Sequence, residues 1–213
     1  MPPFSTSPEP PLSLRLEHYW REVARVARDV DLPALERAGE ALLACQARGR
    51  VVFAIGNGGS AATASHFTCD LSKGTRRGGP PTFHAVALTD NVPVMTAWAN
   101  DNSFERVFVE QLVSLARPGD VLVAISVSGT SPNIVAAVQQ AKALGLTVIS
   151  LTGRAGGALR ALSDVTVAVP SDSMEVVEDA HLIVAHSLCV AAREQLAGLP
   201  LQEDPEPPAQ LAS

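Results

Sequence analysis

The chain has 213 residues, of which 46% are hydrophobic, 18% are charged and only 4% are aromatic, and its formal net charge is −6. This length suits a single domain with a sizeable core. The acidic balance argues against binding to nucleic acid or to an anionic membrane surface, because such binding depends on clustered Lys and Arg. We find no run of about 20 apolar residues and no leader-like start, so we expect a cytoplasmic protein.

Proline is concentrated at both ends of the chain, where residues 2–11 and 200–208 hold nine of the 16 prolines. We therefore predict disordered tails over residues 1–12 and 199–213, around one domain of residues 13–198. The three cysteines, Cys45, Cys69 and Cys189, lie far apart in apolar surroundings and lack Cys-x-x-Cys spacing. We expect them to be reduced and packed.

Two segments with helical periodicity, 13–30 and 33–48, precede any strand. Five apolar, mostly β-branched runs then occur, at 51–55, 83–88, 121–126, 147–151 and 165–169. They do not alternate with polar residues, which is typical of strands covered on both faces in a parallel sheet. Segments long enough for crossover helices separate them, and a last, largely buried helix is predicted over 175–196. The predicted fold class is α/β, a doubly wound five-stranded parallel sheet with extra N-terminal helices.

The turn after the third predicted strand, SVSGTSP (126–132), is rich in hydroxyl groups. It lies at the carboxyl end of a strand, which is where open parallel sheets bind ligands. Ser131 followed by proline predicts a helix N-cap. Ser126 and Ser128 are then left beside free amides at the positive end of a helix, so the turn predicts a phosphate site.

The turn after the first predicted strand, GNGGSA (56–61), supplies glycines for close backbone approach and places Ser60 to cap the next helix. This turn also fits the G-x-G-x-x-G/A fingerprint of dinucleotide sites. That fingerprint expects an acidic residue about 20 positions on, where this chain has Arg76. The dinucleotide interpretation is therefore disfavoured.

Three segments, GNGGSAATASHF (56–67), AISVSGTSPNIV (124–135) and LTGRAGG (151–157), together resemble the sugar isomerase (SIS) domain family, and within it the phosphoheptose isomerases. The resemblance covers about residues 33–196. It implies a homotetramer with sites at subunit interfaces and a reaction that converts sedoheptulose 7-phosphate, through an enediol, to a D-glycero-heptose 7-phosphate. The substrate-binding residues it implies are Asn57, Gly58, Gly59, Ser60, Asp101, Ser126, Val127, Ser128, Ser131 and Glu178.

The resemblance also implies proton transfer by Asp70 and His186, and a zinc ion held by His66, Asp70, Glu178 and His186. His66 and Asp70 are one helical turn apart, and Glu178 and His186 are about 80° past two whole turns, so each pair can face one cavity. Two nitrogens and two oxygens form a plausible zinc set. One carboxylate cannot be a tight ligand and a free base at the same moment, so the role of Asp70 stays open.

The chain departs from the family pattern at three positions. Asp70 stands where the family has Glu, and a carboxylate shortened by one methylene can cost about a hundredfold in rate if it is the base. Glu178 stands where many members have Gln, and its charge would favour a cation or raise the pKa of a neighbouring carboxylate. Gly74 stands where the family has an arginine, whose role as an anion clamp could pass to Lys73 or Arg76.

Two alternatives remain for the function. One is a non-catalytic SIS tetramer that binds a protein partner such as a replication initiator, and the other is an SIS isomerase or sensor for another phosphosugar. The joint presence of His66, Asp70 and His186 favours an enzyme over the first. For the side chains outside these sets we expect interhelical packing of His181, packing of Cys69, and surface or sheet positions for His18 and His84.

Overall fold

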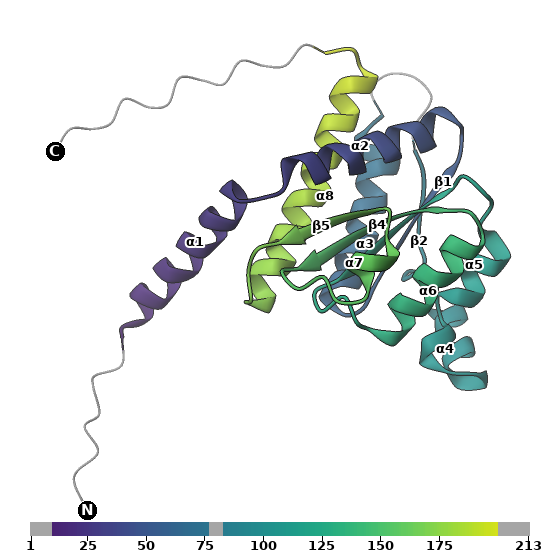
Figure 1. Cartoon of the computed structure of the whole chain (residues 1–213), viewed down its shortest axis with the longest axis horizontal. Coiled ribbons are helices and arrows are strands. Elements are labelled where there is room, and N and C mark those ends of the chain that lie inside the picture. The colour runs from purple at the N-terminus through teal and green to yellow at the C-terminus, as the bar shows by residue number, and fades with distance from the viewer. Residues whose placement is uncertain (1–9, 77–82, 200–213) are drawn as a thin grey trace, which may run out of the picture.

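The computed structural model describes residues 10–76 and 83–199, and within them five strands form one parallel sheet in the order β2-β1-β3-β4-β5 (Figure 1). The strands are β1 (Val51–Gly56), β2 (His84–Ala87), β3 (Val121–Ser126), β4 (Thr147–Gly153) and β5 (Val165–Val169). Nearly every side chain of β1, β3 and β4 is buried. Coverage on both faces explains their uninterrupted apolar sequences and confirms the predicted doubly wound fold.

Helices cover both faces of this sheet. One face packs against α2 (Leu32–Ala47), α3 (Gly59–Cys69) and α8 (Met174–Leu196). The other packs against α5 (Val109–Leu115), α6 (Pro132–Ala143) and α7 (Leu159–Leu162), with α4 (Val92–Asp101) and the short helix η2 (Phe104–Arg106) beside them. The π-helix η1 (Asp70–Gly74) continues α3.

The order of the strands reverses between β1 and β3, where Gly56 pairs with Ile125. In doubly wound sheets this switch point opens a crevice at the carboxyl ends of the two strands. The glycine turn after β1 and the serine turn after β3, defined here as residues 126–131, both lie at this position. The fold therefore brings together the two turns that the sequence singles out.

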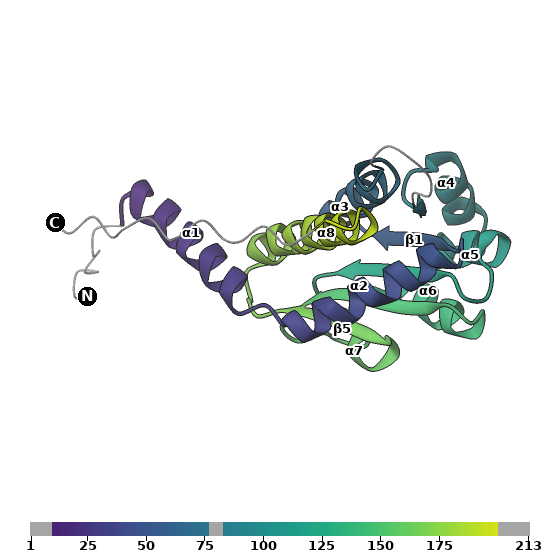
Figure 2. The same ribbon diagram turned by 90° about the horizontal axis from the view of Figure 1, so that it is seen from above.

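The first helix, α1 (Leu12–Arg28), projects away from the sheet, and only its last turns pack on α8 (Figures 1 and 2). The apolar stripe of α1, made of Leu12, Leu16 and Trp20, is 70%, 56% and 69% exposed. These residues follow one another at intervals of four and so lie on one face of the helix. Nothing in the described part of the chain covers that face.

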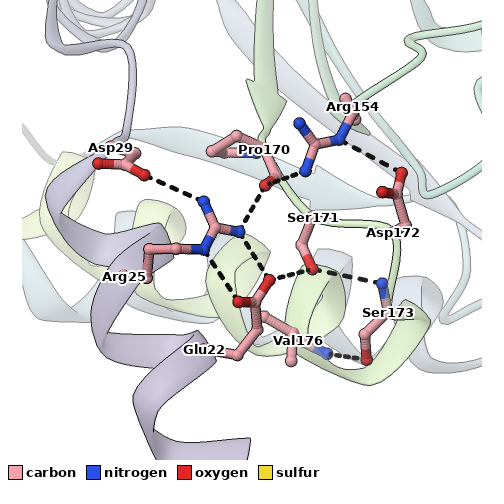
Figure 3. A network of polar contacts seen from close by, with 9 residues as sticks. All are labelled: Glu22, Arg25, Asp29, Arg154, Pro170, Ser171, Asp172, Ser173 and Val176. Atoms are coloured by element: carbon pink, nitrogen blue, oxygen red, sulfur yellow. Dashed lines mark hydrogen bonds and ion pairs between the residues drawn. The ribbon is translucent and has the colours of Figure 1, made fainter.

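A polar junction joins the last turns of α1 to the loop that starts α8 (Figure 3). Arg25 binds Glu22 at 2.6 and 2.9 Å and also donates to the carbonyl of Pro170 at 2.8 Å. Ser171 donates to Glu22 at 3.0 Å, and the hydrogen bonds from Arg25 and then Ser171 lower the pKa of Glu22 to about 2. Ser173 caps α8 through the amide of Val176. The junction thus fixes where α8 begins.

Some details of the structure differ from what the sequence predicts. The predicted tails fall mainly on residues 1–9 and 200–213, outside the described residues, and α1 already starts at Leu12. Cys45 and Cys189 are buried, but Cys69 is exposed, because it lies on the side of α3 that turns away from the core. His18 and His84 are exposed as expected. None of the described helices has the length and hydropathy needed to span a membrane.

Candidate functional site

The serine turn is held by its own hydrogen bonds. The Ser126 hydroxyl lies 3.3 Å from that of Ser131 and accepts from the amide of Gly129 at 3.2 Å. The Ser128 hydroxyl accepts from the amide of Thr130 at 3.2 Å. Ser131 occupies the N-cap position of α6 as predicted, but its side chain makes no capping bond. Its hydroxyl instead faces Ser126, so it remains with the group of hydroxyls available to a ligand.

A glycine is required inside this turn. Gly129 has a φ of +66°, a backbone conformation that residues other than glycine rarely adopt. A Cβ built on it would lie only 2.1 Å from the carbonyl oxygen of Gly156, in the loop after β4. The serine turn and that loop therefore pack backbone against backbone, and this contact fixes the height of the turn above the sheet.

Asn133, which the sequence analysis did not single out, links the two turns of the switch point. Its amide and that of Asn57 exchange reciprocal hydrogen bonds of 2.8 and 2.9 Å, and Asn133 also accepts from the amide of Ile134 at 3.0 Å. It is 2% exposed. The available signal was an asparagine in the first turn of a predicted helix, where its side chain competes for backbone amides.

A pocket of about 180 Å³ opens between the two turns and the start of α8. It is lined by Asn57, Ser60, Ile125, Ser126, Val127, Ser128, Ser131, Met174 and Glu178. Because a single water needs only about 10–15 Å³, the pocket has room for a phosphate-sized group. Its donors are neutral hydroxyls and amides at the start of a helix, the arrangement that binds anions.

Only some of the predicted substrate-binding residues line this pocket. Gly58 ends the β1–α3 turn and, rather than Ser60, is the N-cap of α3, whose first residue is Gly59. Ser60 was expected to cap because it follows the glycines, but α3 already begins at Gly59. Asp101 ends α4, is exposed, and is not among the residues that line the pocket.

Among the described residues that line the pocket, Glu178 is the only one with a charged side chain. Its carboxylate lies against the backbone of Gly59, where a Cβ would meet both carboxylate oxygens at 2.8 Å. Gly59 is the first residue of α3, and the positive end of a helix stabilises a nearby carboxylate. A side chain at position 59 would displace Glu178, so this glycine and this glutamate depend on each other.

A second group lies at the other end of α3. The Nε2 atoms of His66 and His186 are 3.1 Å apart. The Oδ2 atom of Asp70 is 3.3 Å from the Nε2 of His66 and 3.5 Å from the Nε2 of His186. The three side chains are between 31% and 49% exposed, so the group opens to solvent. We call these three residues the histidine cluster.

The histidine cluster fits a zinc ion. Ligand atoms at about 2.0–2.1 Å from a tetrahedral ion stand roughly 3.3 Å from one another. The three distances in the cluster, 3.1, 3.3 and 3.5 Å, match that spacing, and the ligand types suit zinc. The structure therefore brings together three of the four ligands implied by the resemblance. The fourth, Glu178, lies in the serine-lined pocket and is not part of the cluster.

The pocket and the cluster lie along the same seam between two helices. Helices α3 and α8 lie side by side (Figure 2), with Glu178 opposite Gly59 and His186 opposite His66. Along the seam the residue numbers of α3 and α8 increase in the same direction, so the two helices run parallel. Glu178 and His186 are separated by about 12 Å along α8, because an α-helix rises 1.5 Å per residue. The seam thus carries the serine-lined pocket at one end and the histidine cluster at the other.

Two further residues of α8 are buried. His181 is fully buried, burial lowers its pKa to about 4, and the backbone of Thr152 on β4 is its neighbour. It therefore packs against β4 of the sheet, a contact that our expectation of interhelical packing did not include. Burial and then the charge of Asp70 raise the pKa of Cys189 to about 12, so this thiol stays protonated. Neither Lys73 nor Arg76 lines the serine pocket.

A family model described as the SIS domain matches residues 18–153. A phosphoheptose isomerase from Shewanella loihica is 40% identical over 159 residues, 73% of this chain and 80% of that protein. A probable phosphoheptose isomerase from Thermoplasma acidophilum is 36% identical over 83% of this chain and 97% of its own length. The solved phosphoheptose isomerase from Neisseria gonorrhoeae superposes with a TM-score of 0.80 at 34% identity, covering 85% of this chain and 98% of the other. The chain therefore belongs to the SIS domain family.

Proposed function

We propose that this protein is a ketose–aldose isomerase that converts sedoheptulose 7-phosphate to a D-glycero-heptose 7-phosphate. The observation that carries this proposal is the seam between α3 and α8, with an anion site at one end and the histidine cluster at the other. In the substrate, the phosphate on C7 and the carbonyl at C2 likewise lie near opposite ends of the carbon chain. The relatives named phosphoheptose isomerase support the same reaction.

The reaction moves one proton from C1 to C2 through an enediol. At the same time the hydroxyl on C1 loses its proton and becomes the aldehyde oxygen, and the carbonyl oxygen on C2 gains a proton and becomes a hydroxyl. The reaction needs a base, an acid and an electrophile for the oxygen. We assign the proton transfers to Asp70 and His186, whose side chains meet at 3.5 Å. The hydroxyls and amides of the serine turn hold the phosphate and so fix the position of the reacting carbons.

We further propose that the histidine cluster can hold zinc through His66, Asp70 and His186, so that Asp70 and His186 act either as ligands or as proton-transfer groups at any one moment. The fourth ligand implied by the resemblance, Glu178, would have to leave its position against Gly59 to reach the ion. When bound, the ion would stabilise negative charge on the substrate oxygens. The spacing of the three ligand atoms supports this proposal. The charge of Glu178, where many relatives would have a neutral side chain, favours a cation nearby.

We propose that the protein is a cytoplasmic homotetramer with sites completed at subunit interfaces. The exposed apolar stripe of α1 and an apolar groove between α1, α2 and α8 support association of copies. An exposed Asp101 that lines no part of the serine pocket in its own chain supports a site completed by a second copy. Cys45, Cys69 and Cys189 are all free, which suits a reducing compartment.

The decisive experiment is to incubate the purified protein with sedoheptulose 7-phosphate and to follow the aldose product by NMR, with and without a chelator. We expect turnover that the chelator abolishes and that added zinc restores. Asp70→Asn, which keeps the size of the side chain but removes its charge, should be inactive. If the native protein shows no turnover, the proposal is refuted. If only Asp70→Glu shows turnover, the protein has the scaffold of the isomerase but not its activity.

A further inference from the structure

Helix α3 changes its hydrogen-bonding pattern at the histidine cluster. It is α-helical from Gly59 to Cys69, and η1 then follows as a π-helix from Asp70 to Gly74. A π-turn pairs each carbonyl with the amide five residues on, instead of four, and widens the helix by one residue. Such turns are rare and are frequently found at functional sites. Asp70, a member of the cluster, is the first residue of this turn.

Thr75 follows the π-turn and supplies it with a hydrogen bond. The side chain is buried, and its hydroxyl donates to the carbonyl of Leu71 at 2.6 Å. In a continuous α-helix that carbonyl would accept from the amide of residue 75. Leu71 is itself fully buried in the core, so its carbonyl has no access to bulk water and an unpaired state would be unfavourable. The Thr75 hydroxyl therefore provides a partner in the widened turn.

Gly74, the last residue of the π-turn, lies beside Asp70. A Cβ on Gly74 would be 3.8 Å from the Cβ of Asp70 and 4.0 Å from its Oδ1. The Oδ2 atom of Asp70 faces the other way, toward both histidines. The turn thus passes along one side of the carboxylate while the cluster occupies the other. Any change in the path of the backbone from 70 to 75 would move the carboxylate relative to the histidines.

We propose that Thr75 is a positioning residue, whose hydroxyl holds the π-turn in the shape that aims the Asp70 carboxylate at His66 and His186. This inference deepens the proposed function, because it concerns the same metal site. The short side chain of Asp70 makes the requirement stricter. A glutamate has one more rotatable bond with which to compensate for a backbone shift, whereas the oxygens of an aspartate follow the backbone closely.

The test compares Thr75→Val, which keeps the shape but removes the hydroxyl, with Thr75→Ser, which keeps the hydroxyl. The measurement is the affinity of the metal-free protein for zinc, by competition with a chromophoric chelator, with no substrate present. Loss of a group that orients a ligand typically lowers metal affinity 10–100-fold. We expect such a loss in Thr75→Val and near-native affinity in Thr75→Ser. Native affinity in a folded Thr75→Val would overturn the inference.

A second comparison separates positioning from general stability. Thr75→Val is repeated in an Asp70→Glu background, where we expect the loss of zinc affinity to be at least several-fold smaller. An equal loss in both backgrounds would show that Thr75 does not act through Asp70 and would overturn the inference. If Thr75→Val does not fold, as judged by thermal melting, Thr75→Ala takes its place.

These measurements also keep the two proposals apart. If the native protein binds zinc but does not isomerise sedoheptulose 7-phosphate, the proposed function is refuted. The role of Thr75 is then decided by the zinc affinities of the variants alone. A native protein that binds no zinc overturns the role of Thr75, whatever its turnover.

Discussion

The serine turn and the histidine cluster lie on one helical seam but are built in opposite ways. The serine turn is closed by its own hydrogen bonds, and Ser126 is 5% exposed. The cluster opens to solvent, and its polar side-chain contacts join His66, Asp70 and His186 to one another. The turn therefore has its binding geometry before any ligand arrives. In the cluster, two histidine nitrogens and a carboxylate oxygen converge on one point, and such a group of ligand atoms is best satisfied by a cation.

This difference predicts which end controls binding and which controls chemistry. The serine turn, with its neutral donors, should determine how tightly the phosphate is held. The histidine cluster should determine the rate of proton transfer. Substitutions at the two ends should then separate KM from kcat.

The largest effect is expected at the cluster. His186→Gln removes one imidazole while the serine turn stays intact, and loss of a positioned acid or base typically lowers the rate by about 10²–10⁴-fold. We expect kcat to fall by that factor with little change in KM, as measured by steady-state kinetics with sedoheptulose 7-phosphate. His84→Gln, at an exposed position on β2, is the control and should retain native kinetics. A raised KM with unchanged kcat would contradict the assignment.

The next effect concerns the backbone of the serine turn. In Gly129→Ala the new Cβ would lie 2.1 Å from a backbone oxygen, so strain from the positive φ is added to a contact that cannot relax cheaply. We expect a loss of about 3 kcal/mol or more in the free energy of unfolding, measured with urea. Gly49→Ala is the matched control. Gly49 has a φ of +63° in the left-handed turn that ends α2, and nothing lies within 4 Å of its Cβ, so only about 1 kcal/mol should be lost.

The two regions also differ in how far the sequence predicts them. The serine turn is a contiguous pattern after an apolar strand, so its position and its neutral donors follow from local rules. The His66–Asp70 pair follows from helical spacing, but its contact with His186, 120 positions away, depends on α3 and α8 packing in parallel. Asn133 and the π-turn at Asp70 have no comparable local signal. The partner of Asn133, Asn57, lies 76 positions away and is brought to it by the fold, and in the π-turn tertiary packing overrides the preference for a regular helix.

A smaller effect is expected from a single hydroxyl of the serine turn. In Ser126→Ala the pocket loses a donor to the phosphate, and a hydrogen bond to a charged group contributes about 1.5–3 kcal/mol. We expect KM to rise about 10–100-fold while kcat changes little. Ser150→Ala, another buried serine whose hydroxyl faces Thr166 on β5, is the control for packing and should leave KM unchanged. A fall in kcat without a change in KM would place Ser126 with the cluster instead.

The smallest effect tests whether the two ends are independent. His181 lies on α8 between Glu178 and His186, but it faces the sheet, and burial lowers its pKa to about 4 from 6.5. Below pH 6.5 the unfolded chain therefore takes up a proton that the folded chain does not, so stability falls as the pH drops from 6.5 toward 4. At pH 5.5 the loss should be about 1 kcal/mol, and it should disappear in His181→Leu.

Urea unfolding of both proteins at pH 7.5 and 5.5 gives this difference, and His18→Gln, at an exposed position, should keep the native pH dependence. Because His181 contacts neither the pocket nor the cluster, His181→Leu should also keep native KM and kcat at pH 7.5. If either constant changes together with the pH dependence, the packing of α8 on the sheet controls the seam. The two ends would then be coupled through the helix that carries Glu178 and His186. They would not function independently, although they are built differently.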